Sequence, residues 1–168
     1  MEVEFKSAVL PADLRRLRAF DRKTFPPSDL FSIEDWKEYE SYWMIIDGTT
    51  VGCCAFQKHV DFQEDIRPKA TGCGLNPRMQ GSLYISTTGI LPKYQGAGLG
   101  SLFKSWQIAY ARRNGFHRIV TNTRSRNARM IALNRKFGFR ILRTTPGYYR
   151  DPTDSTVVME LRVKPNSR

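Results

Sequence analysis

Acidic residues are almost absent from the middle and the end of this sequence. No Asp or Glu occurs between Asp65 and Asp151, and residues 85–168 hold 3 acidic residues against 16 Lys and Arg. Residues 1–84 are nearly balanced, with 13 acidic residues and 11 Lys and Arg. A half-chain with a net charge of +13 is expected to attract a polyanion. Nucleic acid, a membrane surface and a phosphate-rich small molecule all fit that charge.

Cysteine is also scarce, since the 168 residues contain only Cys53, Cys54 and Cys73. The number is odd and no Cys-x-x-Cys pair is present, so we expect neither a disulfide framework nor a zinc site, and no metal cofactor. No apolar run is long enough to span a bilayer. The first residues, MEVEFKSAVL, lack the apolar stretch of a signal peptide. These features predict a cytoplasmic protein with no membrane partner.

Strand and helix patterns alternate along the chain in an order typical of a mixed α/β sheet. β-Branched and alternating apolar runs predict strands at residues 3–9, 42–46, 51–59, 82–91, 117–123, 139–144 and 156–162. Apolar residues at helical spacing predict helices at 11–23, 32–39, 99–114 and 127–137. The apolar face of the third helix is expected to be Leu99, Leu102, Phe103, Trp106 and Tyr110.

The remaining segments suggest how the chain is organised. Asp47-Gly48 is a hairpin signal between two expected strands. Residues 60–80 are expected to form a long loop. The length fits a single domain, which we place at residues 1–163, followed by a flexible tail at 164–168. The sequence leaves open whether the protein is a monomer or a homodimer.

A glycine-rich run separates the strand expected at 82–91 from the helix that follows it. Gly96, Gly98 and Gly100 have no Cβ, so phosphate oxygens can approach the backbone closely. The free N–H groups of the first helical turn point at the same space. The spacing differs from the dinucleotide fingerprint G-x-G-x-x-G, and no lysine stands at the P-loop position. The run therefore predicts an anion cradle of another kind.

Three segments resemble one enzyme family. The run Ile90-Leu91-Pro92-Lys93-Tyr94-Gln95-Gly96-Ala97-Gly98-Leu99-Gly100 resembles the pyrophosphate loop of the GCN5-related N-acetyltransferases, the GNAT family. The segment from Asn127 to Phe139 is similar to their last helix and its Gly-Phe ending. Gly147-Tyr148-Tyr149, followed by a strand, resembles the final hairpin of the subset that acetylates protein N-termini.

The resemblance implies the acyl-CoA N-acyltransferase (GNAT) fold, a single α/β domain with a mixed, mostly antiparallel sheet flanked by helices. It implies that the sheet opens between the strands at 82–91 and 117–123. It also implies an acetyl-CoA-dependent N-acetyltransferase that transfers the acetyl group to a primary amine by direct attack in a ternary complex. The amine would belong to a small molecule or to a peptide N-terminus.

The family pattern also implies which residues meet the co-substrate acetyl-CoA. They are Thr88, Gly89, Ile90, Gln95, Gly96, Ala97, Gly98, Leu99, Gly100, Ser101 and Asn127. Asn127 is equally well placed to cap the helix that follows it, and it could do both.

The expected proton-transfer residues depart from the family pattern. Asn122 stands where the peptide-acetylating subset often has a glutamate base, and Asn134 stands where it often has a tyrosine acid. We predict a catalytic set of Asn122, Asn134 and Tyr149. Neighbours on a strand point to opposite faces, so only one of Tyr148 and Tyr149 can face the cleft. Other relays stay open, among them Asp61, Glu64, Asp65, Tyr84, His59, His117, Asp151, Asp154 and a water chain.

Two other readings remain. The amides at positions 122 and 134 fit a non-catalytic module that binds acyl-CoA without turnover. The basic half fits a nucleic-acid-binding domain, but we find neither a recognition helix nor a cluster of exposed aromatics, so nucleic acid is not expected as a partner. The sequence identifies neither the acceptor amine nor the preferred acyl chain.

Overall fold

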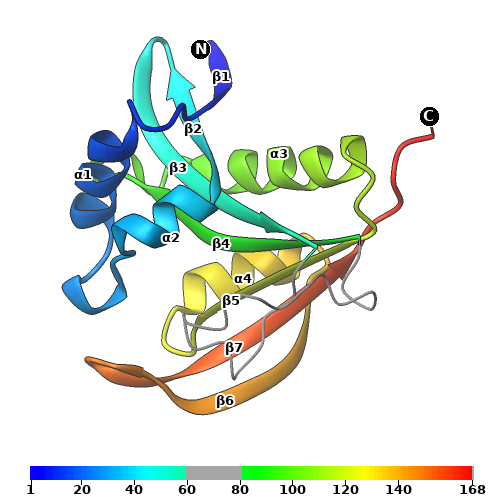
Figure 1. Ribbon diagram of the computed structural model, residues 1–168. Helices are drawn as coiled ribbons and strands as arrows, with labels where there is room; N and C mark the ends of the chain where they lie inside the picture. Colours follow the sequence, from blue (N-terminus) through cyan, green and yellow to red (C-terminus); the bar gives the residue numbers. More distant parts are fainter. Residues whose placement is uncertain (60–80, 168) are drawn as a thin grey trace. The chain divides into compact units, whose positions relative to one another are not determined.

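The computed structural model describes residues 1–59 and 81–167. These residues form two compact units (Figure 1). The first comprises Met1–Gln57 and Ser86–Phe103, and the second comprises the described residues of Lys58–Ile85 and Lys104–Arg168. Strand β4 (Ser82–Ile90) and helix α3 (Leu99–Arg113) each contribute residues to both units. The expected loop at 60–80, with the candidate bases Asp61, Glu64 and Asp65, lies outside the described residues.

The first unit is a set of antiparallel strands with two helices. Strand β1 (Val3–Ser7) pairs with β2 (Glu40–Ile46), and β2 pairs with β3 (Thr49–Lys58). The turn between β2 and β3 is Asp47-Gly48, with φ angles of 46° and 76°. Two positive φ angles are what a type I′ hairpin turn requires, so the hairpin signal is confirmed.

The helices of the first unit begin and end at recognisable signals. Helix α1 (Leu14–Thr24) stops before Pro26, and the 3-10 turn η1 (Pro27–Asp29) follows. Helix α2 (Ile33–Glu38) starts with a complete capping box between Ser32 and Asp35. The core of this unit contains Leu17, Phe20, Trp36, Trp43, Cys53 and Ala55.

The second unit contains the other strands and a helix. The first four residues of β4 pair in parallel with β5 (Arg118–Arg124), which pairs antiparallel with β7 (Thr153–Arg162). Strand β6 (Arg140–Arg150) pairs antiparallel with β7. Helix α4 (Ala128–Lys136) packs on β7, since the Nδ2 atom of Asn134 lies 3.7 Å from the Sδ atom of Met159.

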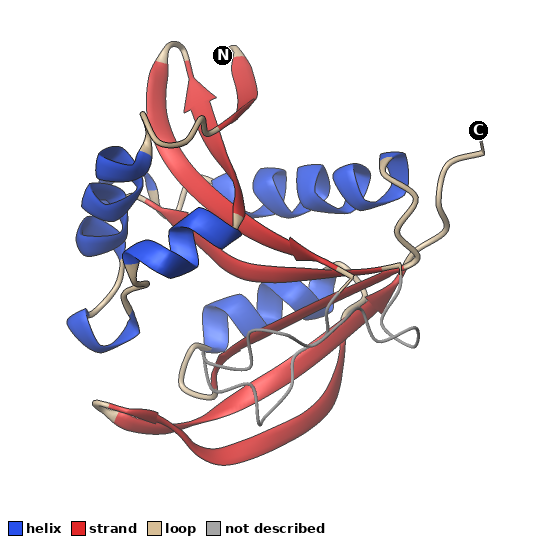
Figure 2. Ribbon diagram, viewed as in Figure 1, coloured by secondary structure: helices blue, strands red, loops and turns tan. Residues whose placement is uncertain are grey.

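The strand order among the described residues is β1-β2-β3-β4-β5-β7-β6, and only the β4–β5 neighbours are known to run parallel. Figure 2 shows the same elements by type, with helices and strands in both units. A mixed, mostly antiparallel α/β sheet flanked by helices is therefore confirmed. No helix in the described ranges is both long enough and apolar enough to cross a membrane.

Two expectations about elements were wrong in detail. The last hairpin is longer than predicted, because Pro146 and Gly147 lie within an irregularity of β6 between Thr145 and Tyr149 and do not end the strand. On α3, Leu102 and Trp106 are only half-buried.

The buried face of α3 includes polar side chains that an apolar pattern does not reveal. Lys104 and Gln107 are 1% and 0% exposed. The ammonium group of Lys104 lies 5.2 Å from the ring centroid of Phe139, so the face of an aromatic ring stabilises its charge. The expected face was therefore wrong at Leu102 and Trp106, and it missed these two residues.

Candidate functional site

The glycine-rich loop lies in the first unit, between the end of β4 and the start of α3. It opens with the 3-10 turn η3 (Pro92–Tyr94), and Gly96 and Gly98 then adopt φ angles of +84° and +79°. A side chain is strained in this left-handed region, which explains glycine at both positions. A Cβ at either glycine would meet no atom of the described residues within 4 Å. The backbone of the loop is therefore bare on the side where those Cβ atoms would stand.

The N–H groups of the loop are partly used and partly available. Ser101 and Leu102 both donate to the carbonyl of Gly98, at 3.1 and 3.2 Å. Within the described residues, the N–H groups of Gly96, Ala97 and Gly98 donate to no protein acceptor. Three adjacent donors beside open space have the chemistry of an anion cradle.

Two further contacts hold the loop against the end of β4. The side-chain amide of Gln95 donates to the carbonyl of Ile90 at 2.9 Å, and the N–H of Leu91 donates to Val51 on β3. Gly89 is buried, and a Cβ there would stand 2.7 Å from the Cγ2 atom of Thr24. Glycine at position 89 thus lets β4 approach the end of α1.

In the second unit, the candidate functional side chains lie mainly on one face of β5 and β7. Side chains alternate between the two faces of a strand, so every second residue shares a face. On β5 these are Arg118, Val120, Asn122 and Arg124, and their partners on β7 are Arg162, Glu160, Val158 and Thr156. The face has Val120 and Val158 in its middle, packed with Tyr84 and Leu142. Polar clusters lie on either side of this apolar centre.

The first cluster, at the carboxyl end of β5, joins Tyr84, Asn122, Tyr149 and Thr156, and we call it the amide–phenol cluster. The hydroxyl of Tyr84 donates to the Oδ1 atom of Asn122. The Nδ2 atom of Asn122 donates to the hydroxyl oxygens of Thr156 and Tyr149, at 3.0 and 3.3 Å. Two of the three predicted catalytic residues, Asn122 and Tyr149, are therefore brought together.

The third predicted catalytic residue, Asn134, lies elsewhere. Its neighbour Met159 is paired with Thr121 and so points to the opposite face of the sheet from Asn122. Asn134 is 0% exposed, and its Oδ1 atom has no hydrogen-bond partner among the described residues. The structure thus separates Asn134 from the other two.

Tyr149 is also held by Arg124, which the sequence analysis did not connect with it. The guanidinium carbon of Arg124 lies 4.2 Å from the ring centroid of Tyr149. The same group donates to the carbonyls of Pro152 and Asp151, at 2.7 and 3.3 Å. Arg124 therefore ties the turn between β6 and β7 to the end of β5. These residues lie close together because of the register of the β6–β7 hairpin. No local sequence motif predicts that register.

Asn127 begins α4 as its N-cap. Its side-chain oxygen accepts from the N–H of Met130 at 3.1 Å. The capping role is confirmed, and the predicted contact with a cofactor stays a prediction.

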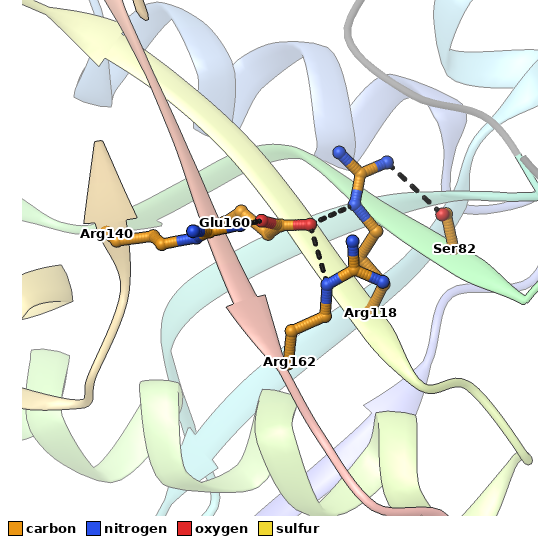
Figure 3. A network of polar contacts seen from close by, with 5 residues as sticks. All are labelled: Ser82, Arg118, Arg140, Glu160 and Arg162. Atoms are coloured by element: carbon orange, nitrogen blue, oxygen red, sulfur yellow. Dashed lines mark hydrogen bonds and ion pairs between the residues drawn. The ribbon is translucent and has the colours of Figure 1, made fainter. Parts of the chain in front are cut away.

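The second polar cluster surrounds Glu160 at the amino end of β5 (Figure 3). Its carboxylate, 2% exposed, pairs with Arg118 at 2.5 Å, Arg140 at 2.8 Å and Arg162 at 3.0 Å. Burial acts to raise the pKa of Glu160, but the hydrogen bonds and charges of these arginines lower it overall. The sequence analysis did not predict this cluster, although an acidic residue in so basic a half of the chain is expected to be paired.

The model of the acetyltransferase (GNAT) family matches residues 12–139. The Drosophila melanogaster protein named Probable N-acetyltransferase san is 32% identical over 112 residues, which are 63% of this chain and 61% of that protein. N-alpha-acetyltransferase 50 of Danio rerio is 30% identical over 100 residues, which are 57% of this chain and 60% of that protein.

A solved structure agrees with the fold. That of yncA from Salmonella typhimurium, which contains its cofactor acetyl-CoA, has a TM-score of 0.73 at 18% identity, covering 100% of this chain and 98% of that one. The matched stretches of the two curated relatives cover about three fifths of their lengths. Because the family match takes in the glycine-rich loop and most of the chain, the protein belongs to the acetyltransferase (GNAT) family.

Proposed function

We propose that the protein is an N-acetyltransferase that transfers the acetyl group of acetyl-CoA to a primary amine by direct attack in a ternary complex. The observation that carries the proposal is the loop at residues 95–101, with its unused N–H groups at Gly96, Ala97 and Gly98. A diphosphate fits such a cradle because its oxygens accept hydrogen bonds from adjacent backbone donors. Family membership and the named relatives support the same activity.

We assign the cofactor-binding roles as follows. Gly96, Ala97 and Gly98 hold the diphosphate through their N–H groups, and Leu99, Gly100 and Ser101 supply the positive end of helix α3. Gln95 keeps the loop closed on Ile90. Thr88, Gly89 and Ile90 offer backbone groups to the pantetheine arm, and Asn127 is also assigned as a cofactor-binding residue. Acetyl-CoA supplies the thioester carbonyl that the amine attacks.

The amide–phenol cluster is the proposed proton-transfer site. Asn122 cannot itself exchange a proton, but its donor and acceptor atoms orient the hydroxyls of Tyr149 and Tyr84. A phenol oxygen can accept a proton relayed from the amine, and a phenol O–H can donate one to the departing thiolate. We assign the donor role to Tyr149 and the orienting role to Asn122. The predicted catalytic role of Asn134, on the other face, is kept as a separate hypothesis.

For the acceptor, we propose the α-amino group of a peptide. Support comes from the name of the Danio rerio relative, N-alpha-acetyltransferase 50, and from the tyrosine-containing final hairpin. We also propose that residues 1–163 act as one domain and that the protein is cytoplasmic. The buried cysteines Cys53 and Cys54 support a reducing compartment.

The test combines binding with turnover. Calorimetry with acetyl-CoA should give a saturable signal, and incubation with acetyl-CoA and a panel of peptides and small amines should release free thiol. Binding without turnover across the panel would favour the acyl-CoA-binding module. Absence of both would reject the enzyme assignment.

A further inference from the structure

A hollow of about 530 Å³ lies at the end of α3 in the second unit, far along β5 from the amide–phenol cluster. Three cationic side chains line it, those of Arg112, Arg162 and Lys164. The other lining residues are Val163, Pro165, Asn166 and Ser167, so no acidic residue of the described chain contributes to it.

Backbone hydrogen bonds hold in place the segments that line this hollow. The N–H of Val163 donates to the carbonyl of His117, and the N–H of Asn166 donates to the carbonyl of Arg112, both at 3.0 Å. The second bond holds residues after β7 beside the last turn of α3. The three cations are thus gathered from a helix end, a strand end and the segment that follows it.

The positive charge continues beyond the hollow onto the sheet. The Nε atom of Arg162 lies 3.0 Å from Glu160, whose single negative charge is shared with Arg118 and Arg140 (Figure 3). One carboxylate cannot neutralise the two exposed guanidinium groups of Arg140 and Arg162. The side chains of Arg140 and Arg162 are 69% and 64% exposed, so their remaining donors face solvent. Glu160 therefore orients these arginines and leaves an excess of positive charge.

We propose that this basic end, defined as Arg112, Arg140, Arg162 and Lys164, binds the phosphate backbone of a polynucleotide. Guanidinium groups with free N–H donors match phosphate oxygens in geometry and charge. Backbone binding needs no recognition helix, so the sequence argument against nucleic acid does not apply to it.

Two other polyanionic partners fit less well. Protein interfaces are usually anchored by aromatic or other large apolar side chains and are depleted in Lys, whereas nucleic-acid interfaces are polar and strongly positive. The exposed large apolar residues of the described chain are Met1, Val9, Ile141 and Tyr148, and none of them lines the hollow. For the same reason the hollow offers no side chain to insert into a membrane.

The basic end is separate from the amide–phenol cluster within the second unit. Arg118 and Asn122 are four residues apart on β5, a separation of about 13 Å. Val120 and Val158 fill the space between them and are fully buried. The basic end and the amide–phenol cluster are therefore distinct groups of side chains, and the inference does not depend on the proposed catalysis.

The experiment measures fluorescence anisotropy of a labelled oligouridylate of about 20 nucleotides across a salt series. The full chain should bind it, and the double variant Arg112→Gln/Lys164→Gln should weaken binding about tenfold at low salt. Losing two phosphate contacts should also reduce the slope of log affinity against log salt by about 1.4. The matched control Arg135→Gln/Lys136→Gln removes two exposed charges from the end of α4 and should change affinity by less than about twofold.

Several results would overturn the proposal. Equal weakening by both double variants would mean diffuse attraction without a site. Displacement of the oligonucleotide by saturating acetyl-CoA would mean that it occupies the cofactor loop. Binding of polyglutamate or phosphatidylserine vesicles in place of the oligonucleotide would assign the surface to another partner. Thermal melting and acetyl transfer by Lys164→Gln alone should match the parent protein, which separates loss of binding from loss of folding.

Discussion

The side-chain amide of Asn122 donates to the hydroxyl oxygen of Tyr149 across 3.3 Å, although 27 residues separate them in the sequence. In this bond the phenol oxygen of Tyr149 accepts, and the proposed mechanism uses its proton for the departing thiolate. Removing the hydroxyl in Tyr149→Phe should therefore lower kcat about 100-fold or more, with the affinity for acetyl-CoA unchanged. Steady-state kinetics and calorimetry measure the two quantities separately.

The neighbouring tyrosine supplies the control for that change. Tyr148 is 43% exposed, and the proposed mechanism gives it no role. Tyr148→Phe should keep kcat within about twofold of the parent protein. A similar loss in both variants would count against Tyr149 as the donor.

Asn134 allows its two possible roles to be separated. Its buried Oδ1 atom has no hydrogen-bond partner in the described part of the chain, a condition that costs about 1–3 kcal/mol. Asn134→Leu, which is apolar and keeps the branching at Cγ, should therefore raise the free energy of unfolding by about 1 kcal/mol in urea titrations. Unchanged turnover would limit Asn134 to packing, whereas a stable but inactive variant would establish the predicted catalytic role.

Gly98→Val should abolish detectable binding of acetyl-CoA in calorimetry. The valine side chain would occupy the open space beside the loop, and it would also strain a backbone whose φ is +79°. Gly48 is the matched control, since its φ is +76° and a Cβ there also meets no atom within 4 Å. Gly48→Val should reproduce the strain and leave the affinity for acetyl-CoA unaltered. Equal loss of affinity in both variants would show that strain, and not the loop, is responsible.

Asp21 should make stability fall as the pH rises. Burial raises its pKa to about 6, and the hydrogen bond from the N–H of Phe31 only partly opposes this. The folded state thus favours the protonated form, so the stabilisation is complete below about pH 4 and is lost as the pH rises to about 6. Up to about 3 kcal/mol is involved.

Asp21→Asn removes this dependence. Its free energy of unfolding, relative to the parent protein, should rise between about pH 4 and pH 7 in urea titrations. Glu34→Gln, which removes an exposed carboxylate from α2, is the control. A pH slope of the same size in the control would refute the assignment to Asp21.

Glu160→Gln should destabilise the second unit by about 3–5 kcal/mol, because it removes the buried carboxylate that three guanidinium groups share. The lowered pKa of Glu160 means that its stabilisation is present above about pH 4.5 and is lost as the pH falls further. Glu4→Gln breaks an exposed pair with Lys6 and should cost less than about 1 kcal/mol. Thermal unfolding at pH 7 compares the two variants, and similar midpoints would show that the buried network contributes little.

The glycine-rich loop could be predicted from the sequence because its chemistry is local. The backbone of the turn requires a positive φ at Gly96 and Gly98. The strand and the helix that flank the turn are each recognisable from their own apolar periodicity. The turn at Asp47-Gly48 and the cap at Ser32 were predictable for the same reason.

The amide–phenol cluster depends on strand pairing between distant segments, which no local sequence pattern predicts. Tyr149 faces Asn122 only because β6 accommodates an irregularity at Pro146 and Gly147, which in sequence suggest the end of a strand. Asn134 was grouped with Asn122 because the family pattern names both positions. The pattern does not say that a sheet separates them.

The alternation of side chains along β5 and β7 has a consequence for how this protein can change. The side chains of Asn122 and Glu160 lie on the same face of β5 and β7, with Val120 and Val158 between them. A point substitution can alter the amide–phenol cluster or the cluster around Glu160 without changing the other. Deleting Val157 would instead turn Thr156 to the face of the sheet on which α4 packs, while Glu160 stayed in place. The polar side chains that now share one face would then be divided between two.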